Sequence, residues 1–339
     1  MKNDKKHPSM LNPIQYLKCR SLAIFLLLLI VNGACNGQSS SGERIIFDSQ
    51  LNSRNQSFEL FSISPDGSDL KQHTFDAVPR RANTSGQLSP DGKHVIFGTY
   101  KYGGYKIAIA KSDFSSQRKL TKGPHYTYVG SWSPDSKQIV YSKVDTKSAP
   151  YFQGDLEIFV MHIDGTRDVN ISNTKGADSG AKWSPSGERI LFSSDRTGNS
   201  DIYSMDVDGK NLKNLTHTPN IDEFGPSWSP NSKQIAFHTM KRNTGSQYID
   251  LCVMDTDGSN KRNLTNNHTA KRNAFVPYYD GASPIFYQTT WSPNGKEIAF
   301  SSKRNSENFE IFIISANGKN LRQLTTNGTN NVFPFWYGK

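Results

Sequence analysis

The chain has 339 residues, with 40 lysine and arginine residues against 30 aspartate and glutamate residues, and a formal net charge of +10 at pH 7. Five basic residues and one acidic residue precede Cys35, so the net charge is +6 from Cys35 onward. This charge suits an acidic partner or an anionic glycan, or only keeps the surface soluble. The three cysteines exclude a disulfide framework, and no nucleic-acid-binding motif accompanies the basic residues.

The first 34 residues have the composition of a secretory signal peptide. Five basic residues precede Leu22–Val31, an apolar run of ten residues, whereas about 20 are needed to span a bilayer. The tripeptide Asn-Gly-Ala then precedes Cys35, as in a lipoprotein processing site. We expect residues 1–34 to be removed and Cys35 to be acylated; the alternative is ordinary cleavage nearby and a soluble secreted product. Residues 35–43 are expected to form a short linker.

After this linker, a six-residue phrase recurs in variant spellings, which indicates a repeat architecture. The prolines of the phrase lie 44, 51, 45 and 63 residues apart, the size of one four-stranded propeller blade. The five copies are LSPDGK at Leu88, WSPDSK at Trp132, WSPSGE at Trp183, WSPNSK at Trp228 and WSPNGK at Trp291.

Each repeat continues with the same succession of short strands. An apolar triplet such as Ile190-Leu191-Phe192 follows the serine-proline turn, and a second run such as Asp201–Met205 comes next. Runs rich in β-branched and aromatic residues, bounded by turn residues, predict strands. An Asp-Gly or Asn-Gly pair such as Asp208-Gly209 then supplies the positive φ of a two-residue hairpin turn, and a polar strand with Leu-Thr ends the unit. Each repeat therefore provides four strands.

The two ends of the repeat region complement each other. The first unit begins in mid-repeat at Ile45 without a preceding tryptophan strand, whereas a tryptophan strand at residues 331–336 follows the last repeat. We therefore predict an all-β fold: a six-bladed β-propeller over residues 44–339, with four-stranded antiparallel blades, closed by the C-terminal strand joining the first blade. This closure removes the exposed sheet edges.

The succession W-S-P-D-G, I-A-F, I-Y-x-M, D-G and L-T, repeated over residues 44–336, resembles the WD-like propeller repeat of the TolB family of bacterial envelope proteins. The resemblance recurs six times and is therefore specific for the fold. It is weak for the function, because one propeller fold serves many functions. TolB proteins carry a small α/β domain ahead of the propeller, and only residues 36–43 separate the expected leader from the first strand here. The resemblance therefore covers the propeller without the TolB N-terminal domain.

Strand order places short turns and long loops at opposite ends of the ring. The insertions, residues 143–155, 238–248 and 266–290, all fall between second and third strands or between blades. Binding residues concentrate on loops of a rigid scaffold, and tyrosine and arginine favour buried contacts with a partner. We expect partner binding on this loop-rich face; the alternative is that the aromatic residues only pack the loops onto the ring. The candidate residues are Tyr151, Phe152, Arg196, Lys241, Arg242, Lys271, Arg272, Tyr278, Tyr279 and Tyr287.

Two recurring acidic patterns are interpreted as structural. An acidic residue opens the third strand in five blades, and we expect these carboxylates to bond loop amides or a loop arginine such as Arg196. Asp206–Asn211 and Asp255–Asn260 resemble the start of a calcium loop, but no glutamate closes either one, so both predict hairpin turns without a metal. The five acidic residues are Glu59, Glu157, Asp201, Asp250 and Glu310, with Lys106 in the remaining blade.

An enzymatic function is the alternative to binding. Oligogalacturonate lyases also resemble TolB repeats, place a metal and catalytic groups on a propeller face, and act on an acidic glycan that suits a basic rim. In this chain His125, His217, His238 and His268 lie near the loop-rich face without the paired spacing of metal ligands. Cys252 lies in an apolar strand and is interpreted as a small buried hydrophobe, and no G-x-S-x-G motif is present.

The sequence thus favours a noncatalytic envelope protein, exported to the periplasm or outer membrane and lipid-anchored through Cys35. It is expected to bind an envelope protein or an anionic glycan on the loop-rich face, as a monomer, without a cofactor and without nucleic acid. Each tryptophan of the repeat phrase is expected to pack between adjoining blades.

Overall fold

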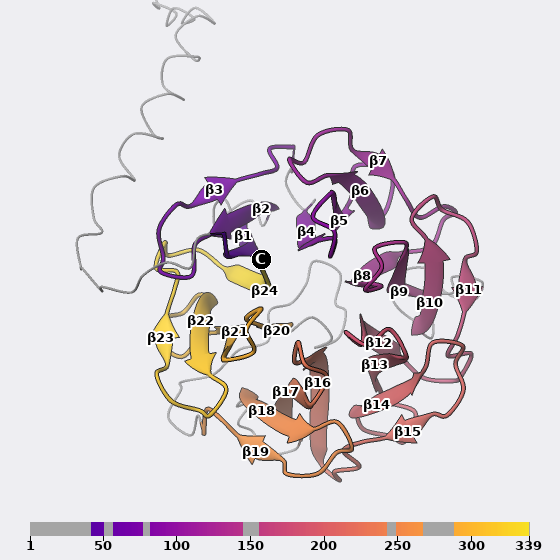
Figure 1. The fold of residues 1–339 in the computed structure, drawn as a ribbon, viewed down its shortest axis with the longest axis vertical. Helices are drawn as coiled ribbons and strands as arrows, with labels where there is room; N and C mark the ends of the chain where they lie inside the picture. Colours follow the sequence, from indigo (N-terminus) through magenta and orange to yellow (C-terminus); the bar gives the residue numbers. More distant parts are fainter. Residues whose placement is uncertain are drawn as a thin grey trace, which may run out of the picture. The chain divides into compact units, whose positions relative to one another are not determined.

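Six four-stranded antiparallel sheets surround a central axis as the blades of a propeller (Figure 1). The computed structural model describes residues 42–50, 57–76, 82–144, 156–242, 249–266 and 288–338. No helix in these ranges is long and apolar enough to cross a membrane. The predicted six-bladed fold is confirmed.

Each blade begins at an inner strand near the axis and continues outward through a second, a third and a short outer strand (Figure 1). The inner strands are β24 (Asn331–Tyr337), β4 (Asn83–Leu88), β8 (Thr127–Trp132), β12 (Asp178–Trp183), β16 (Ile221–Trp228) and β20 (Thr289–Trp291). The second strands are β1 (Arg44–Gln50), β5 (His94–Thr99), β9 (Gln138–Val144), β13 (Arg189–Ser194), β17 (Gln234–Lys241) and β21 (Glu297–Ser302).

The third strands carry the second apolar run of each repeat, and the outer strands are two residues long. The third strands are β2 (Phe58–Ile63), β6 (Lys106–Lys111), β10 (Leu156–His162), β14 (Asp201–Asp206), β18 (Ile249–Asp255) and β22 (Glu310–Ser315). The outer strands are β3 (Lys71–Gln72), β7 (Arg118–Lys119), β11 (Val169–Asn170), β15 (Lys213–Asn214), β19 (Arg262–Asn263) and β23 (Arg322–Gln323).

The C-terminal strand closes the ring as predicted. β24 pairs antiparallel with β1, with Ile45 opposite Trp336 and Ser49 opposite Asn331. Figure 1 shows the yellow β24 beside the indigo β1, so the two ends of the propeller share the first blade. This pairing leaves the inner side of β1 covered by a partner strand.

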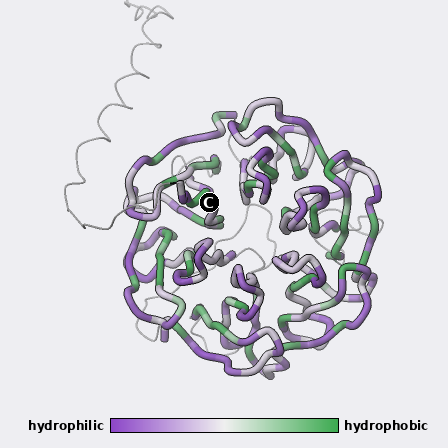
Figure 2. Tube along the Cα trace, in the orientation of Figure 1, coloured by the Kyte–Doolittle hydropathy of each residue, from purple (hydrophilic) through white to green (hydrophobic). Residues whose placement is uncertain are grey.

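The core lies between neighbouring blades, because the second and third strands bury side chains on both of their faces. Figure 2 shows hydrophobic residues along these strands and mainly hydrophilic residues along the outer rim. Each tryptophan of the repeat phrase packs against apolar residues of the preceding blade: Trp132 against Ile96 and Ile107, and Trp291 against Leu251 and Val253, for example. The predicted packing between blades is confirmed.

The inner strands are irregular at one repeated place. A register shift interrupts the pairing of β4, β8, β12, β16 and β24 with their second strands. In β4 the shift places Ser85 at φ 54°, a left-handed conformation that is strained for a residue with a side chain. Both carboxylate oxygens of Asp48 accept a hydrogen bond from the Ser85 amide, at 2.8 and 3.0 Å. The buried Asp48 thereby holds this bulge in place.

The turns between third and outer strands hold three residues, so the prediction of a two-residue turn was wrong. Between β10 and β11 the Gly165 amide donates to the His162 carbonyl at 2.9 Å, and the His162 amide donates to the Thr166 carbonyl at 2.9 Å. Gly165 has φ 86° and ends a type I turn as a bulge residue. We call the end of the ring with these turns and the serine-proline turns (from Ser89, Ser133, Ser184, Ser229 and Ser292) the turn face; the opposite end is the loop-rich face.

Candidate functional site

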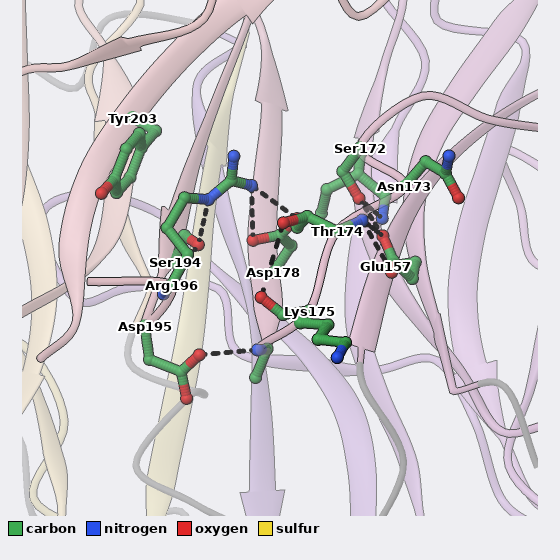
Figure 3. Close-up of polar contacts among 12 residues, drawn as sticks. Glu157, Ser172, Asn173, Thr174, Lys175, Asp178, Ser194, Asp195, Arg196 and Tyr203 are labelled. Carbon is green, nitrogen blue, oxygen red and sulfur yellow. Dashed lines mark hydrogen bonds and ion pairs between the residues drawn. The ribbon is translucent and has the colours of Figure 1, made fainter. Parts of the chain in front are cut away.

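Arg196, one of the residues predicted to bind a partner, is held within its own blade on the loop-rich face. Its Nη2 donates to both carboxylate oxygens of Asp178 at 3.0 and 2.9 Å, and its Nε donates to Ser194 at 2.8 Å (Figure 3). The guanidinium also lies 5.0 Å from the ring centre of Tyr203. Asp178 opens an inner strand, so Arg196 does not pair with the acidic residue of the third strand, as the sequence had suggested.

Two further predicted residues lie at the next blade of the same face. The Arg242 Nε donates to Asp222 at 2.8 Å and its Nη1 donates to the Gly198 carbonyl at 2.7 Å. Lys241, the last residue of β17, is exposed. The other predicted binding residues and the predicted acylation site lie outside the described residues: Tyr151, Phe152, Lys271, Arg272, Tyr278, Tyr279, Tyr287 and Cys35.

The acidic residues that open the third strands accept hydrogen bonds from hydroxyl and amide groups. Of the two predicted partners, loop amides or a loop arginine, the amides are therefore correct. In blade three, Glu157 accepts hydrogen bonds from the Ser172 hydroxyl at 2.5 Å and from the Thr174 amide at 3.1 Å (Figure 3). The same hydroxyl accepts a hydrogen bond from the Ile158 amide at 2.9 Å. The threonine of each Leu-Thr pair, or Ser172 here, thus links its third strand to the loop beyond. The recurrence of Leu-Thr was the sequence signal for this role.

A pocket of about 810 Å³ opens on the turn face, at the end of the ring opposite the predicted binding loops. This volume lies in the range of ligand pockets. Its wall consists mainly of prolines and aromatic residues from the inner strands and the serine-proline turns, and it also includes the polar residue Gln87 and the acidic residue Asp91. The rings in the wall are those of Pro90, Trp132, Pro134, Trp183, Pro185, Pro230, Trp291, Pro293, Phe335, Trp336 and Tyr337.

The tryptophans of this wall are fixed by hydrogen bonds as well as by packing. The indole N–H of Trp132 donates to the Gln87 carbonyl of the preceding blade at 3.1 Å. Trp183 instead donates within its own turn, to the Gly187 carbonyl at 3.1 Å, and is partly exposed. The pocket wall is therefore rigid around most of the ring, with its most accessible indole in blade four.

Beside this pocket, the ammonium of Lys182 lies at the axis of the ring. It donates to the Gly130 carbonyl at 2.8 Å and to the Gln288 side-chain carbonyl at 3.3 Å. Gly130 has room for no side chain, since a Cβ there would lie 2.3 Å from the Val140 carbonyl oxygen. Burial away from water lowers the pKa of Lys182 from 10.5 to about 7. Sequence reasoning missed this residue because a lysine next to a repeated tryptophan carries no recognisable motif.

The predicted hairpin turns at Asp206–Asn211 and Asp255–Asn260 are confirmed between third and outer strands. Within the described ranges, no three His, Cys, Asp or Glu residues group together as metal ligands would. His238 is buried and stacks on Phe224 with ring centres 5.7 Å apart, and burial lowers its pKa to about 3. Cys252 is buried, as predicted, and burial raises the pKa of its thiol to about 11.

Comparisons with known proteins agree with this architecture. Residues 149–290 match the family model described as the TolB beta propeller domain. An uncharacterized protein of Agrobacterium fabrum is 28% identical over 258 residues, covering 74% of this chain and 79% of that protein. The Tol-Pal system protein TolB of Francisella tularensis is 24% identical over 262 residues, covering 74% of this chain and 53% of that protein. The chain thus spans about half the length of this curated TolB.

Solved structures show the same fold. The crystal structure of TolB from Acinetobacter baumannii superposes with a TM-score of 0.70 at 20% identity, over 94% of this chain and 71% of that one. An oligogalacturonate lyase in complex with manganese superposes with a TM-score of 0.53 at 11% identity, over 83% of this chain and 73% of that one. Both likenesses concern the fold alone. Together with the matching family model and TolB-named relatives, they show that the repeats of this chain are similar to the TolB β-propeller.

Proposed function

We propose that this chain is a noncatalytic binding protein of the bacterial cell envelope, whose turn-face pocket receives a segment of a partner protein. The pocket itself carries the proposal: a rigid, open wall of tryptophan and proline rings at the ring axis offers large apolar contact area with few flexible side chains to order. Relatives named TolB and Tol-Pal system protein TolB support an envelope setting, in which the partner is another envelope protein.

The leader and Cys35 support export and a lipid anchor, which would place the protein in the periplasm or at the outer membrane. We propose a monomer, because ring closure pairs both ends of the propeller within one chain.

The loop-rich face is the second candidate surface. Lys241 is exposed there, and the predicted residues Tyr151, Phe152, Lys271, Arg272, Tyr278, Tyr279 and Tyr287 belong to its long loops. Arg196 and Arg242 already form ion pairs with Asp178 and Asp222. A partner at this face would have to compete with these carboxylates or bind the exposed parts of the two guanidinium groups. This cost favours the turn face as the primary surface.

Site-specific photo-crosslinking distinguishes the two faces. A photoreactive residue replaces Lys137, exposed on the turn face, or Lys241, exposed on the loop-rich face, in cells that express the full chain. We expect one envelope protein to crosslink at position 137 and not at 241. The purified partner should then bind the wild-type protein, and Trp183→Ala should weaken binding with little change in melting temperature. Crosslinks only at position 241, or at neither position, would contradict turn-face binding.

A further inference from the structure

Lys182 is a partly buried cation on an inner strand, near the axis of the ring. It precedes Trp183 on β12, and its ammonium donates to the Gly130 carbonyl at 2.8 Å. The same carbonyl accepts a hydrogen bond from the Gln87 side-chain amide at 2.9 Å. Gln87 lines the turn-face pocket. Because Gln87 and Lys182 donate to the same Gly130 carbonyl oxygen, Lys182 lies next to the pocket wall.

No carboxylate of the described residues forms an ion pair with this ammonium. The ion pairs in these ranges use other lysines and arginines, and both acceptors of Lys182 are neutral oxygens. A lysine ammonium has three N–H donors, of which two are used here. A partly buried cation without a counter-charge costs stability, and burial lowers its pKa to about 7. Such a cost at the wall of a pocket is typical of a binding group.

Lys182 also differs from its counterparts around the ring. The residue before the inner-strand tryptophan, or before Leu88 in blade two, is neutral in every other blade: Gln87, Ser131, Ser227, Thr290 and Phe335. A single positive group of the inner strands therefore lies beside the pocket, whose wall is mainly aromatic and proline-rich and also includes Asp91. Exposed lysines follow four of the serine-proline turns, and two of these turns also carry an exposed aspartate, Asp91 or Asp135. The lysines are Lys93, Lys137, Lys233 and Lys296.

We propose that Lys182 binds a carboxylate of an acidic peptide segment that enters the turn-face pocket. This inference rests on the proposed function, because the segment belongs to the partner. The aromatic and proline wall contacts apolar residues of the segment, while the third N–H of Lys182 binds its Asp or Glu side chain or its terminal carboxylate. A charge-assisted hydrogen bond in a site of low dielectric is strong and specific.

Selection from a phage-displayed library of random dodecapeptides tests the inference on the purified full chain. We expect peptides that bind the wild-type protein and lose affinity for Trp183→Ala to be enriched in Asp and Glu. Their synthetic forms should bind Lys182→Gln about tenfold or more weakly than the wild-type protein. Replacing the peptide Glu by Gln should cause the same loss of affinity for the wild-type protein and no further loss for Lys182→Gln. Amidated and free-acid forms of each peptide distinguish a side-chain carboxylate from a terminal one.

Three controls separate charge recognition from a merely structural role. Lys137→Gln removes an exposed charge beside a serine-proline turn and should change affinity little. Lys182→Arg keeps the positive charge and should retain much of the binding that Lys182→Gln loses. Affinity for the wild-type protein should fall as the pH rises above about 7, because Lys182 then loses its proton, and should stay level for Lys182→Arg.

Two outcomes would overturn the inference in distinguishable ways. Peptides that depend on Trp183 but bind Lys182→Gln as tightly as wild type would leave the proposed function in place and remove the role of Lys182. A library without any peptide that depends on Trp183 would contradict both the pocket as a binding site and the inference that rests on it.

Discussion

Asp48 is a buried acid whose carboxylate binds a backbone amide rather than a cation. Both of its oxygens accept the Ser85 amide, and burial raises its pKa well above the usual value, a rise that this hydrogen bond partly offsets. Because the pKa is raised in the folded state, folding favours the protonated form. The stability that protonation contributes is complete below the unfolded pKa of 3.8 and is lost as the pH rises through the folded pKa.

The change Asp48→Asn should therefore stabilise the protein at neutral pH. Asparagine keeps an oxygen acceptor for the Ser85 amide and carries no charge to desolvate, so we expect a gain of about 1–3 kcal/mol at pH 7. The gain should shrink toward pH 4, where Asp48 is protonated as well. Chemical denaturation of both proteins at several pH values measures this difference. A gain that does not vary with pH would show that the carboxylate is not the source of the cost.

At the scale of the strand, the inner-strand tryptophans anchor each blade to its neighbour. Trp132→Ala removes an indole that is 6% exposed and packs against Ile96 and Ile107, so we expect a loss of about 3–5 kcal/mol in the free energy of unfolding. Trp183→Ala is the matched control, because this indole is partly exposed and bonds within its own turn. Equal losses for the two variants would contradict the difference in their packing.

The closing strand is the second element that can be tested. Deletion of residues 331–339 removes β24, exposes the pairing edge of β1 and uncovers the apolar residues around Trp336. We expect aggregation or loss of a cooperative unfolding transition, because unpaired edges and apolar surface promote association. Deletion of Gly338 and Lys339 alone keeps β24 and serves as the control. A truncated protein that melts like wild type would show that the first blade does not need its inner strand.

Strands and ring closure could be predicted because they follow from local periodicity and from a repeat whose two ends complement each other. The inner-strand bulge was not predicted, since Ser85 adopts its positive φ through a bond to Asp48, 37 residues away. The turn-face pocket was missed for a related reason. Its prolines belong to the repeat phrase, where their role as turn residues already accounts for them. Only the closed ring brings these prolines together around one axis.

At the scale of the whole molecule, attachment to the membrane is predicted to depend on one cysteine. Cys35→Ala should release the protein from membranes, because acyl chains on this residue would carry the entire anchor. Fractionation of cells that express either form, with mass spectrometry of the mature amino terminus, checks this expectation. An unmodified amino terminus in the wild-type protein would contradict lipidation.

The place where the chain enters the propeller limits how far the pocket can stand from such an anchor. Gly42, at the entry, and Gly338, at the exit, both line the turn-face pocket. Seven residue steps separate Cys35 from Gly42, and a fully extended chain covers at most roughly 25 Å over that length. With Cys35 acylated as predicted, a tether of only these seven residue steps would join the lipid to the propeller. Such a short tether would confine the propeller to the membrane surface, and this confinement would raise the effective concentration of other membrane-tethered segments around it.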